Sequence, residues 1–173
     1  FINADEIAKG LSPFQPEKVA IDAGRLMLMR MNEMLHLKED FAIETTLATK
    51  SYANFIRRAQ NEGYFVTLIY FWLESPELAI RRVEQRVSFG GHHVDEDVIR
   101  RRYYAGIKNL FSMFIPISDY WILLDNSVDP FRMIAEGEKS KIVDIQDEDI
   151  FYLLKNIYSR RSRLHTLVQA YYP

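Results

Sequence analysis

The feature that most constrains this sequence is a run of ten residues, 64–73 (YFVTLIYFWL), that is almost wholly apolar. A second apolar run, YWILL, occupies residues 120–124. Runs of this kind are typical of strands that are buried on both faces of a parallel sheet. The 173 residues of the chain are enough for one domain with a sizeable core. The two runs therefore predict a sheet in the interior of a single domain.

Helical patterns alternate with these strands. From residue 17 to about residue 35, apolar side chains, several of them methionines, recur at spacings of three and four, which predicts a long helix. Strands that alternate with helices predict an α/β fold with a mainly parallel sheet and helices on both faces. Further helices are expected at 51–61, from 76, from 95 and at 147–168, and shorter strands at 1–4, 41–43 and 141–145.

The composition argues against several classes of function. With 22 basic and 24 acidic residues, the chain has no overall field that would attract nucleic acid or a membrane surface. It contains no cysteine, which excludes thiol chemistry and fits a reducing cytoplasm. Its four histidines do not have zinc-ligand spacings, so no metal-ligating set is expected. No apolar run reaches the roughly 20 residues that span a bilayer.

Polar side chains gather where the expected strands end. In open parallel sheets, ligands bind at the carboxyl ends of the strands. Several carboxylates on one rim repel each other, so a bound cation or a role in proton transfer explains them better than packing does. The polar residues at these ends are Asn3, Asp5, Glu44, Thr45, Thr46, Glu74, Asp125 and Asn126.

Each of these residues also has a structural interpretation. Asp5 is either a general base or a magnesium-shell carboxylate, or else it caps a short helical turn at residues 6–9. Glu44 and the two threonines after it suit a polar substrate, but they could instead cap the helix that starts near Ser51. Residues 125–127 (DNS) form either a nucleotide-base loop or a simple Asx turn, and the turn is the favoured interpretation.

Arginines are concentrated in residues 81–110 (RRVEQRVSFGGHHVDEDVIRRRYYAGIKNL). Two helices that meet at the Gly90-Gly91-His92 break could direct several guanidinium groups and a histidine towards one polyanion, most plausibly a phosphate chain. The alternative is a pair of solvated helices whose arginines pair with nearby acids at spacings of three and four.

Taken in order, six segments resemble the zeta-toxin-like branch of the P-loop kinases. The segments are 1–13 (FINADEIAKGLSP), 41–47 (FAIETTL), 87–94 (VSFGGHHV), 99–103 (IRRRY), 107–110 (IKNL) and 124–127 (LDNS). The resemblance covers residues 1–137, which would form the kinase core. Residues 138–173 would be a C-terminal strand and helix extension of the same domain.

The resemblance implies an ATP- and Mg²⁺-dependent phosphotransferase that acts on a small-molecule hydroxyl, with an antitoxin protein as a possible partner. Asp5 would be the base, and Arg86 and Arg102 would be catalytic lid arginines. The residues implied for substrate binding are Asn3, Glu44, Thr45 and Thr46, and those implied for ATP binding are Gly91, His92, Arg101 and Asn126. In the zeta toxins proper the implied substrate is a UDP-linked amino sugar.

Two features depart from the family pattern. The phosphate-binding loop G-x-x-x-x-G-K-[ST] is absent from these 173 residues, so we expect a P-loop fold without its first strand and loop, inactive as it stands. Ala48 and Thr49 stand where the zeta toxins have an arginine, which weakens the expectation of a UDP-sugar. The alternative function is a non-catalytic nucleotide- or protein-binding module of a toxin–antitoxin-like system.

Overall fold

The computed structural model describes residues 1–169, with side chains as far as residue 159. The chain divides into two compact units. Unit 1 comprises Phe1–Thr45 and Glu84–Val94, and unit 2 comprises Thr46–Val83 and Asp95–Pro173.

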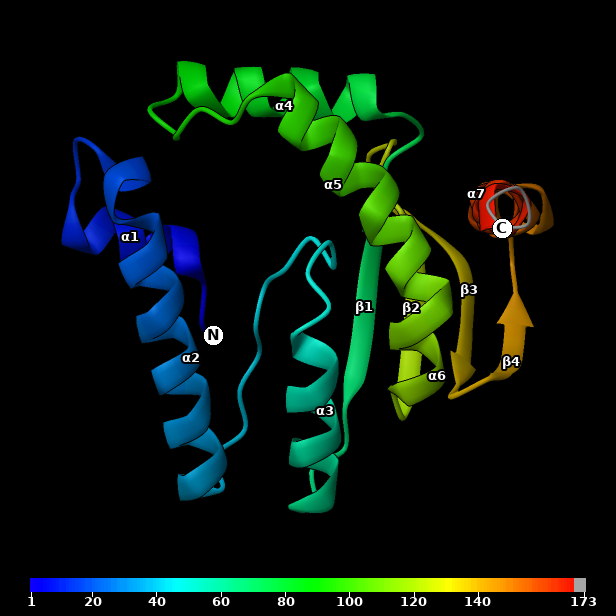
Figure 1. Cartoon of the computed structure of the whole chain (residues 1–173), viewed down its shortest axis with the longest axis horizontal. Coiled ribbons are helices and arrows are strands. Elements are labelled where there is room, and N and C mark those ends of the chain that lie inside the picture. The colour runs from blue at the N-terminus through cyan, green and yellow to red at the C-terminus, as the bar shows by residue number, and fades with distance from the viewer. Residues whose placement is uncertain (170–173) are drawn as a thin grey trace. The chain divides into compact units, whose positions relative to one another are not determined.

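Unit 1 is built around α2 (Ala20–Leu37), the long helix that the periodicity predicts. Its buried residues are Ala23, Met27, Met31, Met34 and Leu35. A 3-10 turn, η1 (Pro16–Val19), precedes it, and α1 (Ala4–Leu11) packs against it (Figure 1). The two short strands expected at 1–4 and 41–43 are reduced to one parallel bridge between Ile2 and Ile43, in which the Ile2 amide donates to the Ala42 carbonyl at 2.8 Å.

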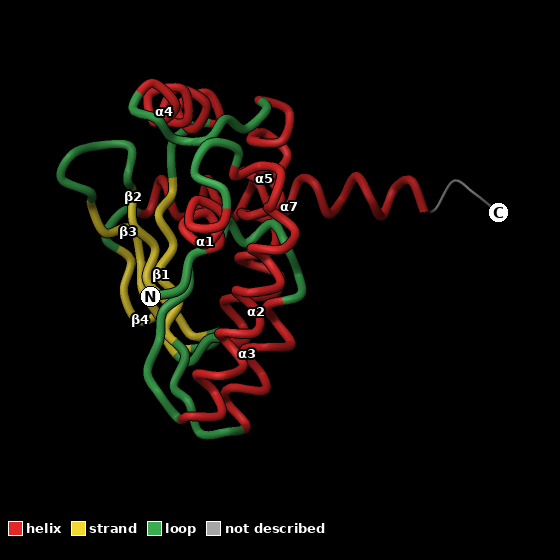
Figure 2. The backbone as a smooth tube through the Cα atoms, turned by 90° about the vertical axis from the view of Figure 1, so that its left-hand side faces the viewer, coloured by secondary structure: helices red, strands yellow, loops and turns green. Residues whose placement is uncertain are grey.

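Unit 2 contains a four-stranded sheet in the order β1-β2-β3-β4 (Figure 1). The strands of this sheet are yellow in Figure 2. The strands are β1 (Thr67–Trp72), β2 (Tyr120–Asp125), β3 (Arg132–Glu138) and β4 (Lys141–Ile145). The α/β class is confirmed, but the sheet is mixed rather than mainly parallel: β1 and β2 are parallel, whereas β3 is antiparallel to both β2 and β4. The connection from β2 to β3 is only residues 126–131, which is too short for the crossover that a parallel pair requires.

Helices supply the rest of unit 2. They are α3 (Tyr52–Asn61), most of α4 (Pro76–Ser88), α5 (Glu96–Asn109), the π-helical turn η2 (Leu110–Phe114), α6 (Ile115–Ile117) and α7 (Glu148–Gln169). Each corresponds to a predicted helix or its continuation. No helix in residues 1–169 is long and apolar enough to cross a membrane.

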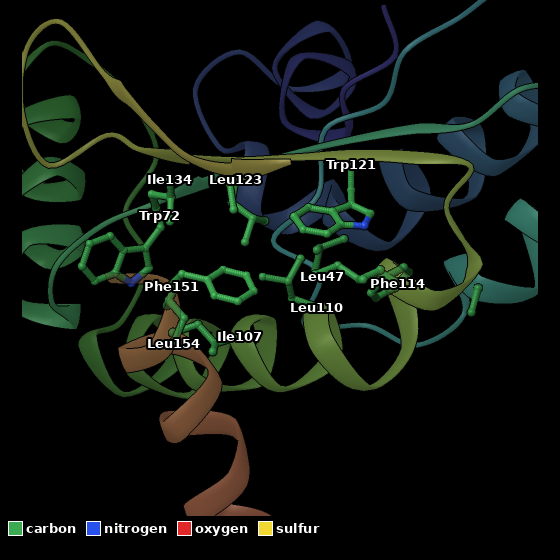
Figure 3. Packing of buried hydrophobic residues seen from close by; sticks show 13 residues of the cluster. Leu47, Trp72, Ile107, Leu110, Phe114, Trp121, Leu123, Ile134, Phe151 and Leu154 are labelled. Carbon is green, nitrogen blue, oxygen red and sulfur yellow. The ribbon is translucent and has the colours of Figure 1, made fainter. Parts of the chain in front are cut away.

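The core of unit 2 lies on one face of the sheet (Figure 3). The strands contribute Trp72, Trp121, Leu123 and Ile134, and the helices contribute Ile107, Leu110, Phe114, Phe151 and Leu154. Full burial of a large apolar side chain contributes roughly 1.5–3 kcal/mol, so this cluster is a main source of the unit's stability. Ile69 and Phe71, which alternate with half-buried residues along β1, remain 52% and 50% exposed, so the expectation that this strand is buried on both faces is wrong.

Candidate functional site

Asp5 lies in the first turn of α1, and Asn3 is the residue that caps this helix. The Asn3 side-chain oxygen accepts a hydrogen bond from the Asp5 amide at 2.8 Å. Asparagine is among the best N-capping residues because its oxygen satisfies an amide that has no partner within the helix. The alternative assignment of Asp5 as the cap is therefore wrong. Its carboxylate is left available for other contacts and is 51% exposed.

Asn3 also fixes the position of Glu44. Its side-chain amide donates to Glu44 Oε2 at 2.7 Å, across 41 positions of sequence. The bridge between Ile2 and Ile43 holds the two backbone segments together next to this bond. Asn3, Asp5 and Glu44, three of the predicted site residues, are thus brought to one place in unit 1.

The end of α4 folds back on itself through two glycines. The Gly90 amide donates to the Val87 carbonyl at 2.9 Å, and the Gly91 amide donates to the Arg86 carbonyl at 2.9 Å. Gly90 has a φ of +87°, a conformation that favours glycine. A β-carbon on Gly91 would lie 2.6 Å from Arg86 Cγ, so only glycine fits there. This turn places the Arg86 side chain beside residue 92.

Arg86 and His92 both face the Asp5 carboxylate. Asp5 Oδ2 is 4.0 Å from Arg86 Nη1 and 3.8 Å from His92 Nδ1. Arg86 Nη2 also donates to the His92 carbonyl at 3.4 Å. Contacts of 3.8–4.0 Å are too long for hydrogen bonds, so the Asp5 oxygens, the Arg86 guanidinium and the His92 ring keep hydrogen-bonding capacity for a ligand. We call Asn3, Asp5, Glu44, Arg86 and His92 the unit 1 cluster.

Other predicted site residues belong to unit 2. Arg101 and Arg102 are exposed on α5, and Thr46 is exposed at the start of the unit. Their neighbour Arg100 forms ion pairs with Glu77 and, at 3.9 Å, with Glu96. Arg100 therefore follows the alternative interpretation of the arginine stretch, in which the arginines form ion pairs on the surface.

The segment after β2 forms the Asx turn that was the favoured interpretation of residues 125–127. The Ser127 amide donates to Asp125 Oδ1 at 2.9 Å. Burial alone would raise the pKa of Asp125, but hydrogen bonds from Ser127 and Arg132 outweigh it and hold the pKa below its ordinary value. The backbone of Asn126 is fixed on both sides: its amide donates to the Trp72 carbonyl at 2.8 Å, and its carbonyl accepts from Arg82 at 2.6 Å.

Tyr103 organises the end of β1, a role that the sequence did not predict. Its hydroxyl donates to the Leu73 carbonyl at 2.7 Å and accepts from Trp72 Nε1 at 3.1 Å. Burial, partly offset by the bond from Trp72, raises the pKa of Tyr103 to about 12, so the hydroxyl stays protonated and remains a donor. The only sequence signal for it was its place in the segment IRRRY.

The residues that the structure describes do not form a magnesium site. Mg²⁺ prefers several oxygen ligands, mainly carboxylates, phosphates and water. Among the described residues, no group of three or more histidines or acids is placed to hold a metal ion. In the unit 1 cluster, Asp5 faces two basic groups, which disfavour a cation. The arrangement fits an anionic ligand better than a metal.

A solved structure shares the α/β fold of this chain. The chain superposes with a TM-score of 0.56 on this structure, which comes from a study of the PezAT chromosomal toxin–antitoxin system of Streptococcus pneumoniae. The two chains are 14% identical, and the match covers 92% of this chain and 74% of the other.

Sequence comparison then gives the family. A sequence model described as zeta toxin matches residues 3–112, and the chain belongs to the zeta toxin family. An uncharacterized protein of Haemophilus influenzae is 31% identical to it over 102 residues, which is 59% of this chain and 73% of that protein. The range matched by the family model includes all the predicted site residues except Asn126.

Proposed function

We propose that the protein is an ATP-dependent phosphotransferase that moves the γ-phosphoryl group of ATP to a hydroxyl of a small molecule. The observation that carries this proposal is the unit 1 cluster, in which one carboxylate faces an arginine and a histidine. Phosphoryl transfer needs a group to orient and deprotonate the acceptor and cationic donors for the charge on the phosphoryl oxygens. Membership of the zeta toxin family supports the same class of reaction.

In this proposal Asp5 accepts the proton of the acceptor hydroxyl. Glu44, oriented by Asn3, binds the substrate together with Thr45 and Thr46. Arg86 and His92 donate to phosphoryl oxygens, and such preorganised donors stabilise developing charge most effectively where water is excluded. In the same proposal Gly91, Arg101, Arg102 and Asn126 serve the nucleotide and its phosphates.

The phosphate cradle of a P-loop kinase is not among these 173 residues. Its backbone amides, lysine and hydroxyl normally hold the nucleotide phosphates and Mg²⁺. We therefore propose that the activity requires this loop in addition to the residues described, and that the 173 residues alone bind ATP weakly. Since the described residues do not form a magnesium site by themselves, Mg²⁺ would be held by that loop and the nucleotide phosphates.

The proposal is tested by screening the natural gene product for transfer of labelled phosphate from ATP. The acceptors would be sugars, nucleosides and nucleotide sugars, of which the nucleotide sugars are the class that the family resemblance favours. The proposal requires a phosphorylated product from at least one hydroxyl acceptor. ATP binding without transfer to any of them would count against it.

A second candidate function is a non-catalytic nucleotide- or protein-binding module that an antitoxin would hold. The observation that favours it is the lack of G-x-x-x-x-G-K-[ST] in the 173 residues. The similar structure from Streptococcus pneumoniae comes from a toxin–antitoxin system, which makes an antitoxin the partner to test. Tight binding of such a partner by a protein that transfers no phosphate would favour this second function.

A further inference from the structure

A buried amide side chain holds the segment that begins unit 2. Asn109, in the last turn of α5, is 3% exposed and lies among apolar core residues. Its Nδ2 donates to the Leu47 carbonyl at 2.8 Å and to the Ala48 carbonyl at 3.2 Å. Burying an amide costs free energy unless its hydrogen bonds are made, so these two bonds are the reason an amide is tolerated in this position.

Gly106 lets α5 approach the same segment closely. It lies three residues before Asn109 and so on the same side of the helix. A β-carbon at Gly106 would be 2.6 Å from the Thr46 carbonyl oxygen, which leaves no room for any other residue. Gly106 and Asn109 together form a docking face for residues 46–48.

The docked segment has an unfavourable backbone conformation. Leu47 has a φ of +55°, a left-handed conformation that is unfavourable for a residue with a side chain. Its side chain is 4% exposed in the core, and its carbonyl is held by Asn109. Such strained conformations persist where the surroundings fix them, and they are concentrated at functional sites.

We propose that Asn109 is a positioning residue for the acceptor substrate. It fixes the backbone of residues 46–48 and so sets where Thr46 presents its hydroxyl. This proposal rests on the proposed function, in which Thr46 binds the acceptor. In this role Asn109 touches neither substrate nor nucleotide, and it controls how the acceptor binds by fixing residues 46–48.

The first test measures the backbone directly and needs no enzymatic activity. Asn109→Leu keeps the size of the side chain but removes the donor, and it is made in the natural gene product. We expect trypsin to cleave after Lys50 about tenfold faster in the variant, with cleavage after Lys38 in unit 1 unchanged. Ser118→Ala is the matched control, because Ser118 is also buried and donates to a backbone carbonyl, that of Phe114 at 2.8 Å.

The second test compares the KM for the acceptor with the KM for ATP. With an acceptor found in the screen, Asn109→Leu is expected to raise the KM for the acceptor about tenfold and to leave the KM for ATP unchanged. If Asn109→Leu does not fold, Asn109→Ser, which is smaller and cannot reach both carbonyls, is measured in the same way.

The outcomes separate the two proposals. Unchanged cleavage after Lys50, equal acceleration at both lysines, or a normal acceptor KM would each overturn the role of Asn109. If the unsubstituted protein transfers no phosphate, the proposed function fails. The cleavage result then decides alone whether Asn109 fixes residues 46–48.

Discussion

Asn3 and Glu44 are joined by a hydrogen bond from the Asn3 amide to Glu44 Oε2, 2.7 Å long. The same Asn3 side chain caps α1 by accepting from the Asp5 amide at 2.8 Å. One amide therefore uses its oxygen to hold the helix that carries the proposed base and its nitrogen to hold a proposed substrate ligand. An ionised aspartate could accept from the Asp5 amide but could not donate to Glu44, which is why asparagine suits the position better than aspartate.

The first prediction separates these two roles of Asn3. Asn3→Asp keeps the capping acceptor but loses the donor, and it places a second negative charge beside Glu44. Asn3→Ala loses both the capping acceptor and the donor. We expect Asn3→Ala to lower the free energy of unfolding by about 1 kcal/mol and Asn3→Asp to change it little. Both variants should lose about tenfold in kcat/KM, equivalent to about 1.4 kcal/mol of transition-state stabilisation. Wild-type turnover in Asn3→Asp would show that the bond to Glu44 is not used.

The second prediction concerns Arg86. Its guanidinium is 47% exposed, and its contacts with Asp5 and the His92 carbonyl are long, at 4.0 and 3.4 Å, so Arg86→Ala should change the free energy of unfolding by less than about 1 kcal/mol. Loss of a donor to the phosphoryl oxygens should lower kcat by about a hundredfold. Arg25→Ala is the control, since Arg25 is an exposed arginine of unit 1 that pairs with Asp22. Equal effects of the two substitutions on turnover would remove Arg86 from the site.

The third prediction concerns the turn that places Arg86. Gly91→Ala puts a β-carbon 2.6 Å from Arg86 Cγ and 2.8 Å from its carbonyl oxygen, so either the turn or the arginine must shift. We expect a clear loss of phosphate transfer with a smaller loss of stability. Gly10→Ala is the control, because a β-carbon there meets nothing within 4 Å and alanine favours the helix. If both variants keep full activity, the close packing of Gly91 has no functional role.

The fourth prediction is a pH dependence of stability. The pKa of Asp125 lies below its ordinary value of 3.8, so the ionised form is the one that the fold stabilises. This contribution is present above pH 3.8 and is lost as the pH falls through the lower pKa of the folded state. In chemical denaturation, Asp125→Asn should therefore be less stable than wild type at pH 7, and the difference should shrink below about pH 4. A difference that is the same at both pH values would contradict this assignment.

Much of unit 2 could be predicted because its signals are local. The apolar runs that became β1 and β2 and the periodic helices need only neighbouring residues to be recognised. β3 was missed because its sequence, RMIAEGE, has no continuous apolar run and includes glycine and alanine, which are poor strand formers. Without β3, the alternation of strands and helices suggested a parallel sheet.

The site was predictable only in part, for a physical reason. Residues 3–6 (NADE) contain a capping asparagine and two acids, a helix-start signal that could have identified α1. By contrast, the contacts of Asn109 with Leu47 and Ala48 span 62 and 61 positions of sequence. Nothing in the local sequence around Asn109 or Gly106 indicates which carbonyls they approach, so these roles emerge only from the tertiary structure.

The most direct test of the proposed chemistry is the rate of phosphate transfer by Asp5→Asn in the natural gene product. Because Asn3 caps α1, the substitution should leave the fold and the affinity for ATP nearly unchanged. Asparagine cannot accept the acceptor's proton, so transfer should fall by roughly a hundredfold or more, the usual contribution of a general base. Near-normal transfer by Asp5→Asn would contradict the assignment of Asp5 as the base.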